Sequence, residues 1–296
     1  MGIENLIHLK GATYLIPGPT NLGLFVEEGD VTLIDSGNDK ESGRRINKIL
    51  KENGWTLKTI INTHSNADHI GGNDYLQRMT DCQIWAPVIE SVFIEHPELE
   101  GSLLWGGYPV KEMRSKFFMA KPSKVTNRIA EGQVCLNDHF TLFPLAGHFF
   151  DMVGVMTGDR VFFLGDCMFG EDILAKYRIP FIYDVAAYKR TITSVREVDA
   201  DVYVLSHGQA TDTIGPIADL NEAIVAQVEE CLERMLVDKL GGDDILKKVC
   251  DHFAITLDYG QYALVGSTVR SFLAYLYNEG RLGYGFLDNR LCWYRL

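Results

Sequence analysis

The segment THSNADHIGG, residues 63–72, carries the most chemical information in this 296-residue chain. It follows an apolar run that is typical of a buried strand and leads into a helical pattern near residues 69–80. Three residues of types that bind metal ions, His64, Asp68 and His69, fall within it. A loop can aim such closely spaced groups at one point, whereas a straight strand would send alternate side chains to opposite faces. The same residue types also serve as caps and turn formers, so this segment alone leaves both interpretations open.

Later segments of the chain have the same form. Each follows an apolar strand and presents a metal-binding residue type beside a glycine, which lets the backbone come close to its neighbours. The segments are Gly147-His148, Gly165-Asp166 and Ser206-His207-Gly208. Each one singly is more typical of a turn, but their order along the chain favours one shared site.

Strands and helices alternate around these segments. The run VTLIDSG, residues 31–37, reads as a buried strand, and residues 40–53 place apolar side chains on one face of a helix that Gly54 closes. Short apolar strands are expected at 133–136, 140–145, 152–157, 160–164 and 202–205. This alternation predicts an α/β architecture.

In this order, after the VTLIDSG strand, the four segments resemble the metallo-β-lactamase fold superfamily of metal-dependent hydrolases over about residues 10–210. The resemblance implies an αββα sandwich whose two sheets carry a two-metal site along one edge. The family's first motif is His-x-His-x-Asp-His. By the resemblance, one ion takes His64, the residue at position 66 and His148, the other takes Asp68, His69 and His207, and Asp166 bridges them.

The resemblance also implies the chemistry of the site. Imidazole and carboxylate ligands suit two divalent ions, and we expect zinc, with iron or manganese as alternatives. A bridging carboxylate holds the two cations ~3.5–4 Å apart, and a water between them becomes a metal-bound hydroxide that attacks the substrate. We expect Asp68 to act in catalysis as well as in metal binding.

The sequence departs from the family motif at its second histidine, which is Asn66 here. An amide oxygen is a neutral donor, weaker than imidazole. The first site is therefore expected to bind zinc less tightly, or to take a metal that tolerates oxygen ligands, which leaves iron open.

Residues 88–130 differ in character from their surroundings and are interpreted as an insertion. His96, within it, could face the site, whereas Cys167 is expected to point away from Asp166 into the core. Several aromatic residues either line an apolar substrate pocket or pack the insertion onto the sandwich, and the sequence does not decide between the two. They are Trp105, Tyr108, Phe117 and Phe118, with Tyr177, Phe181 and Tyr183 from the segment after Asp166.

A change of pattern near residue 214 predicts two domains, 1–214 and 215–296. The second contains a long amphipathic helix after Pro216, helices over 243–255 and 267–279, and a terminal β-hairpin. Helix, helix, hairpin is the winged-helix order and resembles the tail of some hydrolases of this superfamily. With eight basic against twelve acidic side chains in 215–296, we expect packing or homodimer formation rather than nucleic-acid binding.

Composition indicates which cellular environment and which classes of binding partner to expect. The net charge of −12 disfavours binding to polyanions, and six cysteines without CxxC spacing are typical of reduced thiols. The N-terminus lacks the pattern of a secretory leader, and no apolar run is long enough to span a membrane. We therefore expect a cytoplasmic protein that acts on a small-molecule substrate.

The expected activity is metal-dependent hydrolysis of an ester, thioester or lactone of a small organic molecule. Alternatives are an iron-dependent oxidoreductase on the same scaffold, a nuclease of the same superfamily, and a non-catalytic sensor. The acidic balance of the chain weighs against the nuclease.

Overall fold

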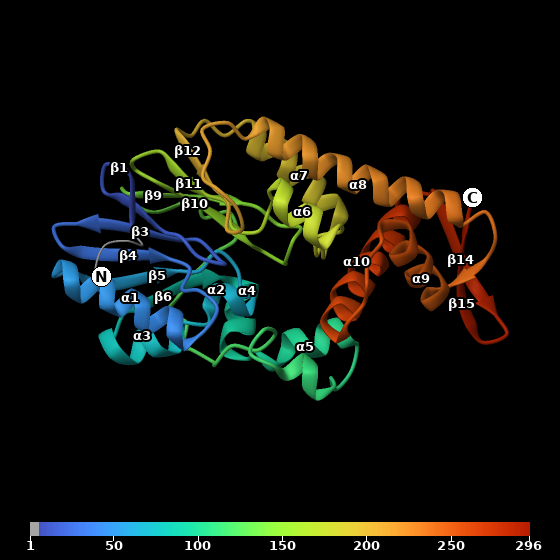
Figure 1. The fold of residues 1–296 in the computed structure, drawn as a ribbon, viewed down its shortest axis with the longest axis horizontal. Coiled ribbons are helices and arrows are strands. Elements are labelled where there is room, and N and C mark those ends of the chain that lie inside the picture. Colours follow the sequence, from blue (N-terminus) through green and yellow to red (C-terminus); the bar gives the residue numbers. More distant parts are fainter. Residues whose placement is uncertain (1–5) are drawn as a thin grey trace.

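Residues 6–296 are described by a computed structural model, shown in Figure 1. The larger part of the molecule is two β-sheets facing each other, with helices on both outer faces. The predicted α/β sandwich is confirmed. The expectation that no leader begins the chain falls partly on residues 1–5, which lie outside the described residues. Among residues 6–296, no helix is both long and apolar enough to cross a membrane.

The first sheet keeps its strands in chain order. Its strands are β1 (Ile7–Lys10), β2 (Thr13–Ile16), β3 (Leu22–Glu27), β4 (Asp30–Ile34), β5 (Thr56–Ile61), β6 (Gln83–Pro87) and β7 (Asn127–Ile129). Neighbours are antiparallel up to β4 and parallel from β4 to β7. Strand β7 lies within the range 88–130 that the sequence analysis interprets as an insertion, and that interpretation stays a prediction.

The second sheet has the order β12-β11-β10-β9-β8. Its strands are β8 (Cys135–Asn137), β9 (Phe140–Pro144), β10 (Val153–Thr157), β11 (Val161–Phe163) and β12 (Val202–Val204). Consecutive strands from β8 to β11 are antiparallel, and β11 pairs with β12 in parallel. Parallel β11 and β12 bring their carboxyl ends, and the loops after them, to the same edge.

Helices cover the outer faces of the sheets (Figure 1). The helices up to residue 196 are α1 (Lys40–Asn53), α2 (Ala67–Ile70), α3 (Asn73–Thr80), α4 (Val88–Glu95), α5 (Glu98–Trp105), the short 3-10 turn η1 (Lys111–Arg114), α6 (Glu171–Tyr177) and α7 (Val185–Arg196). Helix α1 has the predicted bounds: the Asp39 side chain caps it, Gly54 ends it at φ +69°, and Ile46 and Leu50 are buried. The single helix expected near 69–80 is two, α2 and α3.

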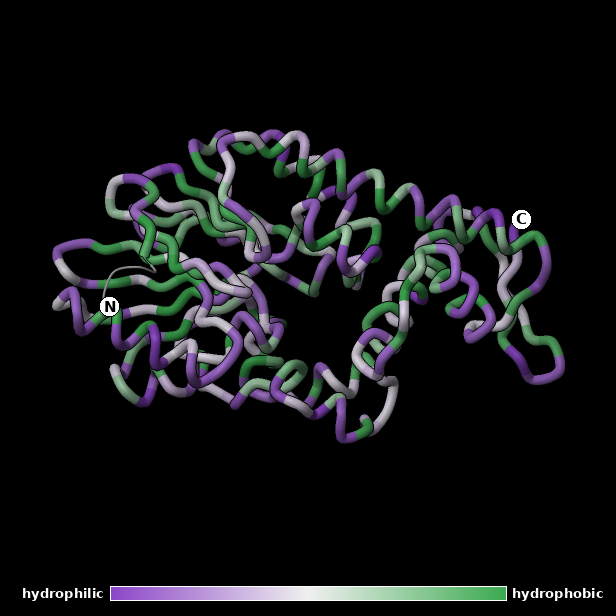
Figure 2. The backbone as a smooth tube through the Cα atoms, viewed as in Figure 1, coloured by the Kyte–Doolittle hydropathy of each residue, from purple (hydrophilic) through white to green (hydrophobic). Residues whose placement is uncertain are grey.

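Three apolar layers hold the sandwich together. One lies between α1, α3 and the first sheet, one lies between the two sheets, and the third lies between the second sheet and α7. Cys167 is fully buried in the third layer, as expected. The green segments of Figure 2 run along the strands that form these layers.

The C-terminal elements extend away from the sandwich (Figure 1). They are α8 (Gly215–Met235), β13 (Leu240–Gly241), α9 (Gly242–Phe253), α10 (Tyr259–Asn278), β14 (Leu282–Leu287) and β15 (Arg290–Arg295). Helix, helix and hairpin follow in the predicted order, while the winged-helix likeness and a domain boundary at 214 stay predictions. Helix α10 begins at Tyr259, not at 267, because Asp258 rather than Ser267 caps it. The third apolar layer continues from α7 through α8 into α9 and α10.

Candidate metal centre

All of the predicted site residues lie at one edge of the two sheets, in the segments that follow four strands. The segment after β5 carries His64 in a loop, Asn66 at the N-cap of α2, and Asp68 and His69 in α2. The loops after β9, β11 and β12 carry His148, Asp166 and His207 respectively. The strands are rigid, so they fix the bases of these loops relative to one another. The structure therefore brings together every residue that the sequence singled out as a ligand.

Two glycines allow these loops to approach their neighbours. Gly147 has φ +132°, and a Cβ there would lie 2.4 Å from the backbone of Tyr188. Gly165 has φ +57°, and a Cβ there would lie 3.2 Å from the side chain of Thr63. A larger residue at either position would push its loop away, so the glycines set the positions of the adjacent His148 and Asp166.

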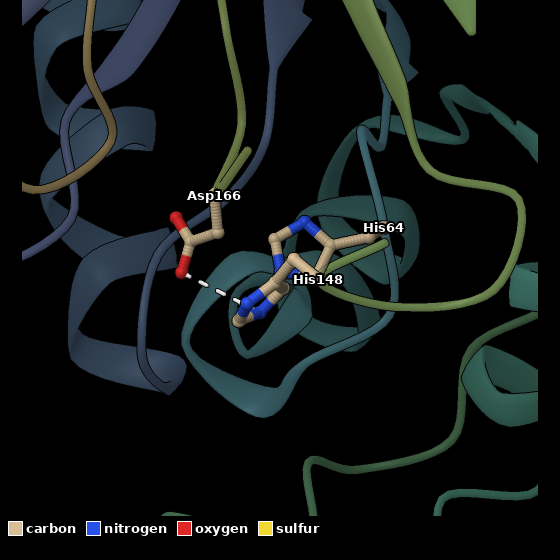
Figure 3. A group of neighbouring side chains, drawn as sticks. All are labelled: His64, His148 and Asp166. Atoms are coloured by element: carbon tan, nitrogen blue, oxygen red, sulfur yellow. Dashed lines mark ion pairs between the residues drawn. The ribbon is translucent and has the colours of Figure 1, made fainter. Parts of the chain in front are cut away.

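The ligand-type atoms form two groups. His64, His148 and Asp166 make the first group, and Asp68, His69 and His207 make the second; within each group the ligand-type atoms lie within 4.8 Å of one another. Figure 3 shows the first group, with the Asp166 carboxylate turned toward the two imidazoles.

Asp166 lies between the groups. Its Oδ2 is 3.8 Å from Nε2 of His148 in the first group and 3.3 Å from Nε2 of His207 in the second. Its Oδ1 is 3.3 Å from Nε2 of His69. One carboxylate thus faces imidazoles of both groups, which is the arrangement that a bridging ligand requires.

The Nδ1 atom of each histidine in the centre lies within hydrogen-bond distance of an oxygen atom. Nδ1 of His69 is 2.8 Å from the Asp35 carboxylate and Nδ1 of His64 is 3.0 Å from Oγ1 of Thr63. Nδ1 of His148 and of His207 face the backbone oxygens of Phe181 and Pro19, at 2.9 and 2.6 Å. These contacts fix the ring orientations and leave Nε2 of every histidine free to face the site.

Several buried atoms at the centre lack a hydrogen-bond partner among the described residues. They are Nε2 of His64, Nε2 of His69 and Oδ1 of Asp166. Buried polar atoms are almost always paired, so an unpaired set that converges on one point calls for a further group. Two imidazole nitrogens and a carboxylate oxygen are donors that suit a divalent cation. The residues present therefore fit a metal centre.

The four histidines of the centre form two pairs whose pKa values shift in opposite directions. Burial opposes protonation of His207, but Asp166 and Asp68 outweigh it and raise its pKa to about 12. His69 behaves alike: Asp166 and Asp35 overcome its burial, and its pKa is raised well above the usual value. Burial and the nearby His69 instead lower the pKa of His64, and burial lowers that of His148. Protons therefore concentrate on the second group when no cation is bound.

Three buried acids near the centre were not identified from the sequence. Asp35, at the end of β4, accepts hydrogen bonds from the backbone N and Oγ1 of Thr63 as well as facing His69. Glu90 of α4 accepts from the backbone N of Ser65, and its burial raises its pKa to about 8. Glu100 of α5 accepts from the Asn66 amide, and its burial raises its pKa well above the usual value. Asp35 lies in the VTLIDSG run, and Glu90 and Glu100 lie in the predicted insertion, but none of the three was predicted as a site residue.

The remaining candidates are less central. His96 does not join the centre; its side chain is 62% exposed and pairs with Glu98. Phe181 and Phe169 lie against His148, with ring centroids 5.5 and 5.7 Å away. Trp105 instead lies near Tyr262 of α10, so this side chain packs the insertion against the C-terminal elements, a contact that the sequence did not indicate.

Comparison with known proteins identifies the family of this fold. The sequence model described as the metallo-beta-lactamase superfamily matches residues 15–207. The chain belongs to the metallo-beta-lactamase superfamily. The resemblance drawn from the four segments is thereby confirmed, and so is, at the level of the family, the expectation of a metallo-hydrolase with divalent metal binding.

Other superfamily members share this fold over nearly the whole chain. A metallo-beta-lactamase family protein from Thermus thermophilus is 18% identical with a TM-score of 0.77, and the alignment covers 96% of this chain and 99% of that one. A beta-lactamase domain protein from Burkholderia ambifaria is 16% identical with a TM-score of 0.78, covering 98% and 94%. At these identities the likeness concerns the fold alone.

Two curated relatives match shorter segments. A hydroxyacylglutathione hydrolase of Rhodopseudomonas palustris is 37% identical over 67 residues, which are 23% of this chain and 26% of the relative. The probable metallo-hydrolase YqgX of Bacillus subtilis is 28% identical over 94 residues, 32% of this chain and 43% of the relative. The chain thus spans less than half the length of either relative.

Proposed function

We propose that this chain is a metal-dependent hydrolase that cleaves an ester, thioester or lactone of a small organic molecule. The observation that carries the proposal is the convergence of two His/Asp groups on Asp166, with buried Nε2 atoms left unpaired. Both relatives are named hydrolases, and the name of one, hydroxyacylglutathione hydrolase, supports an acyl group on a small carrier as the substrate class.

The proposed ligands are His64, Asn66 and His148 at the first ion and Asp68, His69 and His207 at the second, with Asp166 between them. When bound, two divalent ions would supply an acidified water and polarise the substrate's acyl oxygen. We propose zinc at the second group, where no amide replaces an imidazole. The oxygen of Asn66 leaves iron or manganese as alternatives at the first.

In the proposed reaction, the water oxygen bonds to the acyl carbon, and the bond from that carbon to the leaving oxygen or sulfur breaks. The water proton must reach the leaving group. Asp68 is suited to carry it, because its side chain is 32% exposed, whereas that of Asp166 is 7% exposed. Its Oδ2 lies 3.2 Å from Nε2 of His207 and accepts from Oγ1 of Thr20 at 3.1 Å, so the carboxylate is held in place.

We propose that the acyl part of the substrate lies beside two aromatic rings. Phe169 and Phe181 flank His148, and burial of an acyl chain against these rings would bring its carbonyl toward the metal groups. The net charge of −12 weighs against a polyanionic substrate such as RNA or DNA.

The test compares the isolated protein, the chelator-treated protein and protein reloaded with zinc, iron(II) or manganese on a panel of small esters, thioesters and lactones. We expect hydrolysis that chelation removes and one metal restores. His207→Ala should lose it, while His252→Ala on α9, remote from the centre, should keep it. Absence of turnover on every substrate with two ions bound would refute the proposal. Stoichiometric iron with consumption of oxygen would favour the oxidoreductase.

A further inference from the structure

Glu100 is a buried carboxylate whose partner, Asn66, lies in residues 63–69 after β5, called the metal loop below. It comes from α5, within the insertion, and its residue exposure is 6%. Its Oε1 accepts a hydrogen bond from Nδ2 of Asn66 at 2.8 Å. Among residues 6–296 no lysine, arginine or histidine forms an ion pair with it. A carboxylate buried without a cation is costly, so its retention at this point calls for an explanation.

The other end of the Asn66 amide faces the first metal group. Its Oδ1 lies 2.9 Å from Nε2 of His148. With Glu100 ionised, its oxygens can only accept, so the NH2 group of Asn66 faces them. A protonated Glu100 would still offer its carbonyl oxygen to the same donor. Glu100 therefore turns the oxygen of Asn66, rather than its nitrogen, toward His148.

The helix that carries Glu100 is itself held firmly. Leu104, one turn further along α5, is buried together with Met113 and with Ala263 of α10. Nη2 of Arg270, also on α10, donates to the backbone oxygen of Leu104 at 3.3 Å. Helix α10 thus packs against α5 (Figure 1), the helix whose Glu100 contacts Asn66.

We propose that Glu100 is a positioning residue for the first metal group. It locks the Asn66 side chain so that its amide oxygen serves as the ligand where the family motif has its second histidine. The family motif has a rigid imidazole at position 66, whereas Asn66 has a more flexible amide. The hydrogen bond to Glu100 fixes that amide, so that it can serve as a metal ligand. This inference rests on the proposed function, since it presupposes that both groups bind metal.

The test is a zinc titration of the metal-free protein, measured by calorimetry, for wild type and three variants. Glu100→Leu removes the acceptor, and Glu100→Gln keeps an oxygen that can accept from Nδ2 of Asn66. Glu98→Leu removes an exposed acid from the same helix as a matched control. We expect Glu100→Leu to lower the zinc affinity of the first group about tenfold or more and to leave the zinc affinity of the second group unchanged. Glu100→Gln and Glu98→Leu should stay within about threefold of wild type.

A double-variant cycle separates positioning from general stability. In an Asn66→Ala background, Glu100→Leu should have no further effect on zinc affinity, because the residue through which Glu100 acts is gone. If Glu100→Leu does not fold, Glu100→Asp replaces it, since its carboxylate is one methylene too short to reach the amide. Unchanged binding at the second group reports a folded centre in every variant.

Each outcome bears on a distinct claim. Wild type that binds no zinc would refute the proposed function. Wild type that binds two ions, with Glu100→Leu binding both equally well, would overturn the role of Glu100 alone. Equal losses in Glu100→Gln and Glu100→Leu would also overturn it, because they would show that the negative charge, not the orientation of Asn66, is what the site needs.

Discussion

Oδ2 of Asp35 lies 2.8 Å from Nδ1 of His69, and both side chains are almost completely buried. The same carboxylate accepts from the backbone N and Oγ1 of Thr63, next to His64. One residue at the end of β4 therefore braces the metal loop and holds the His69 ring with Nε2 toward Asp166. A carboxylate in this position also makes the imidazole a stronger donor to a cation.

Asp35→Asn is expected to weaken metal binding at the second group about 10–100-fold. An amide in place of the carboxylate removes the charge behind His69 and presents an NH2 group to donors. Asp30→Asn, an exposed position on the same strand, is the control and should leave affinity unchanged. The measurement is the zinc dissociation constant by competition with a chromophoric chelator; equal constants for Asp35→Asn and wild type would argue against this role.

Metal binding at the second group should release protons. The pKa of His207 is raised to about 12 and that of His69 well above its usual value, so both carry a proton at pH 7 when no cation is bound. A metal needs the neutral imidazoles, hence about two protons leave per ion, and affinity should rise about a hundredfold per pH unit near neutrality. Calorimetry in buffers of different ionisation enthalpy counts them; an enthalpy independent of buffer would contradict the prediction.

Asn66→His restores the imidazole of the family motif, and zinc occupancy of the first group should rise, because nitrogen is the better match to zinc. The new imidazole can still donate to Glu100, so its orientation is supported. Hydrolysis need not rise with occupancy, since the ligands also set the basicity of the bound water. Zinc stoichiometry of both proteins is measured beside ester hydrolysis. If wild type already binds two zinc ions equally tightly and the substitution changes neither, Asn66 does not limit the first group.

Asn221 of α8 makes hydrogen bonds with Phe169, which lies beside His148 of the metal centre. Its side chain accepts from the backbone N of Phe169 and the hydroxyl of Tyr188, and donates to the backbone oxygen of Phe169. Asn221→Ala leaves these buried groups unpaired and should lower the free energy of unfolding by about 3 kcal/mol. Asn278→Ala, at the exposed end of α10, should change it by less than about 0.5 kcal/mol. Urea denaturation measures both, and equal stabilities would contradict the prediction.

The sequence predicted that the four segments lie close together because each follows an apolar strand directly. Short spacing in THSNADHIGG and a glycine beside His148 or Asp166 are local signals, and the sheet brings such strand ends to one edge. Glu100 could not be found in this way. It lies 34 residues from Asn66 in an insertion with no ligand-type motif, and only the packing of α5 brings the two together.

The early start of α10 was missed for a related reason. Gly260 and Gly266 weaken the helical pattern between residues 259 and 267, so local propensity favoured a later start at Ser267. Packing of Ala263 against Leu104 and Met113, together with the cap from Asp258, outweighs that preference. The same contact with Ala263 positions α5, which carries Glu100. A helix that starts at residue 267 would not include Ala263, so the sequence did not predict this connection between α10 and the metal centre.

The number of divalent ions that one chain binds tightly tests the central claim most directly. Wild type should bind two, and His69→Ala or His207→Ala should lose the ion at the second group, because each removes one of its ligands. His252→Ala should still bind two. A wild-type chain that binds no divalent ion, or variants of His69 and His207 that keep full metal content, would contradict the account.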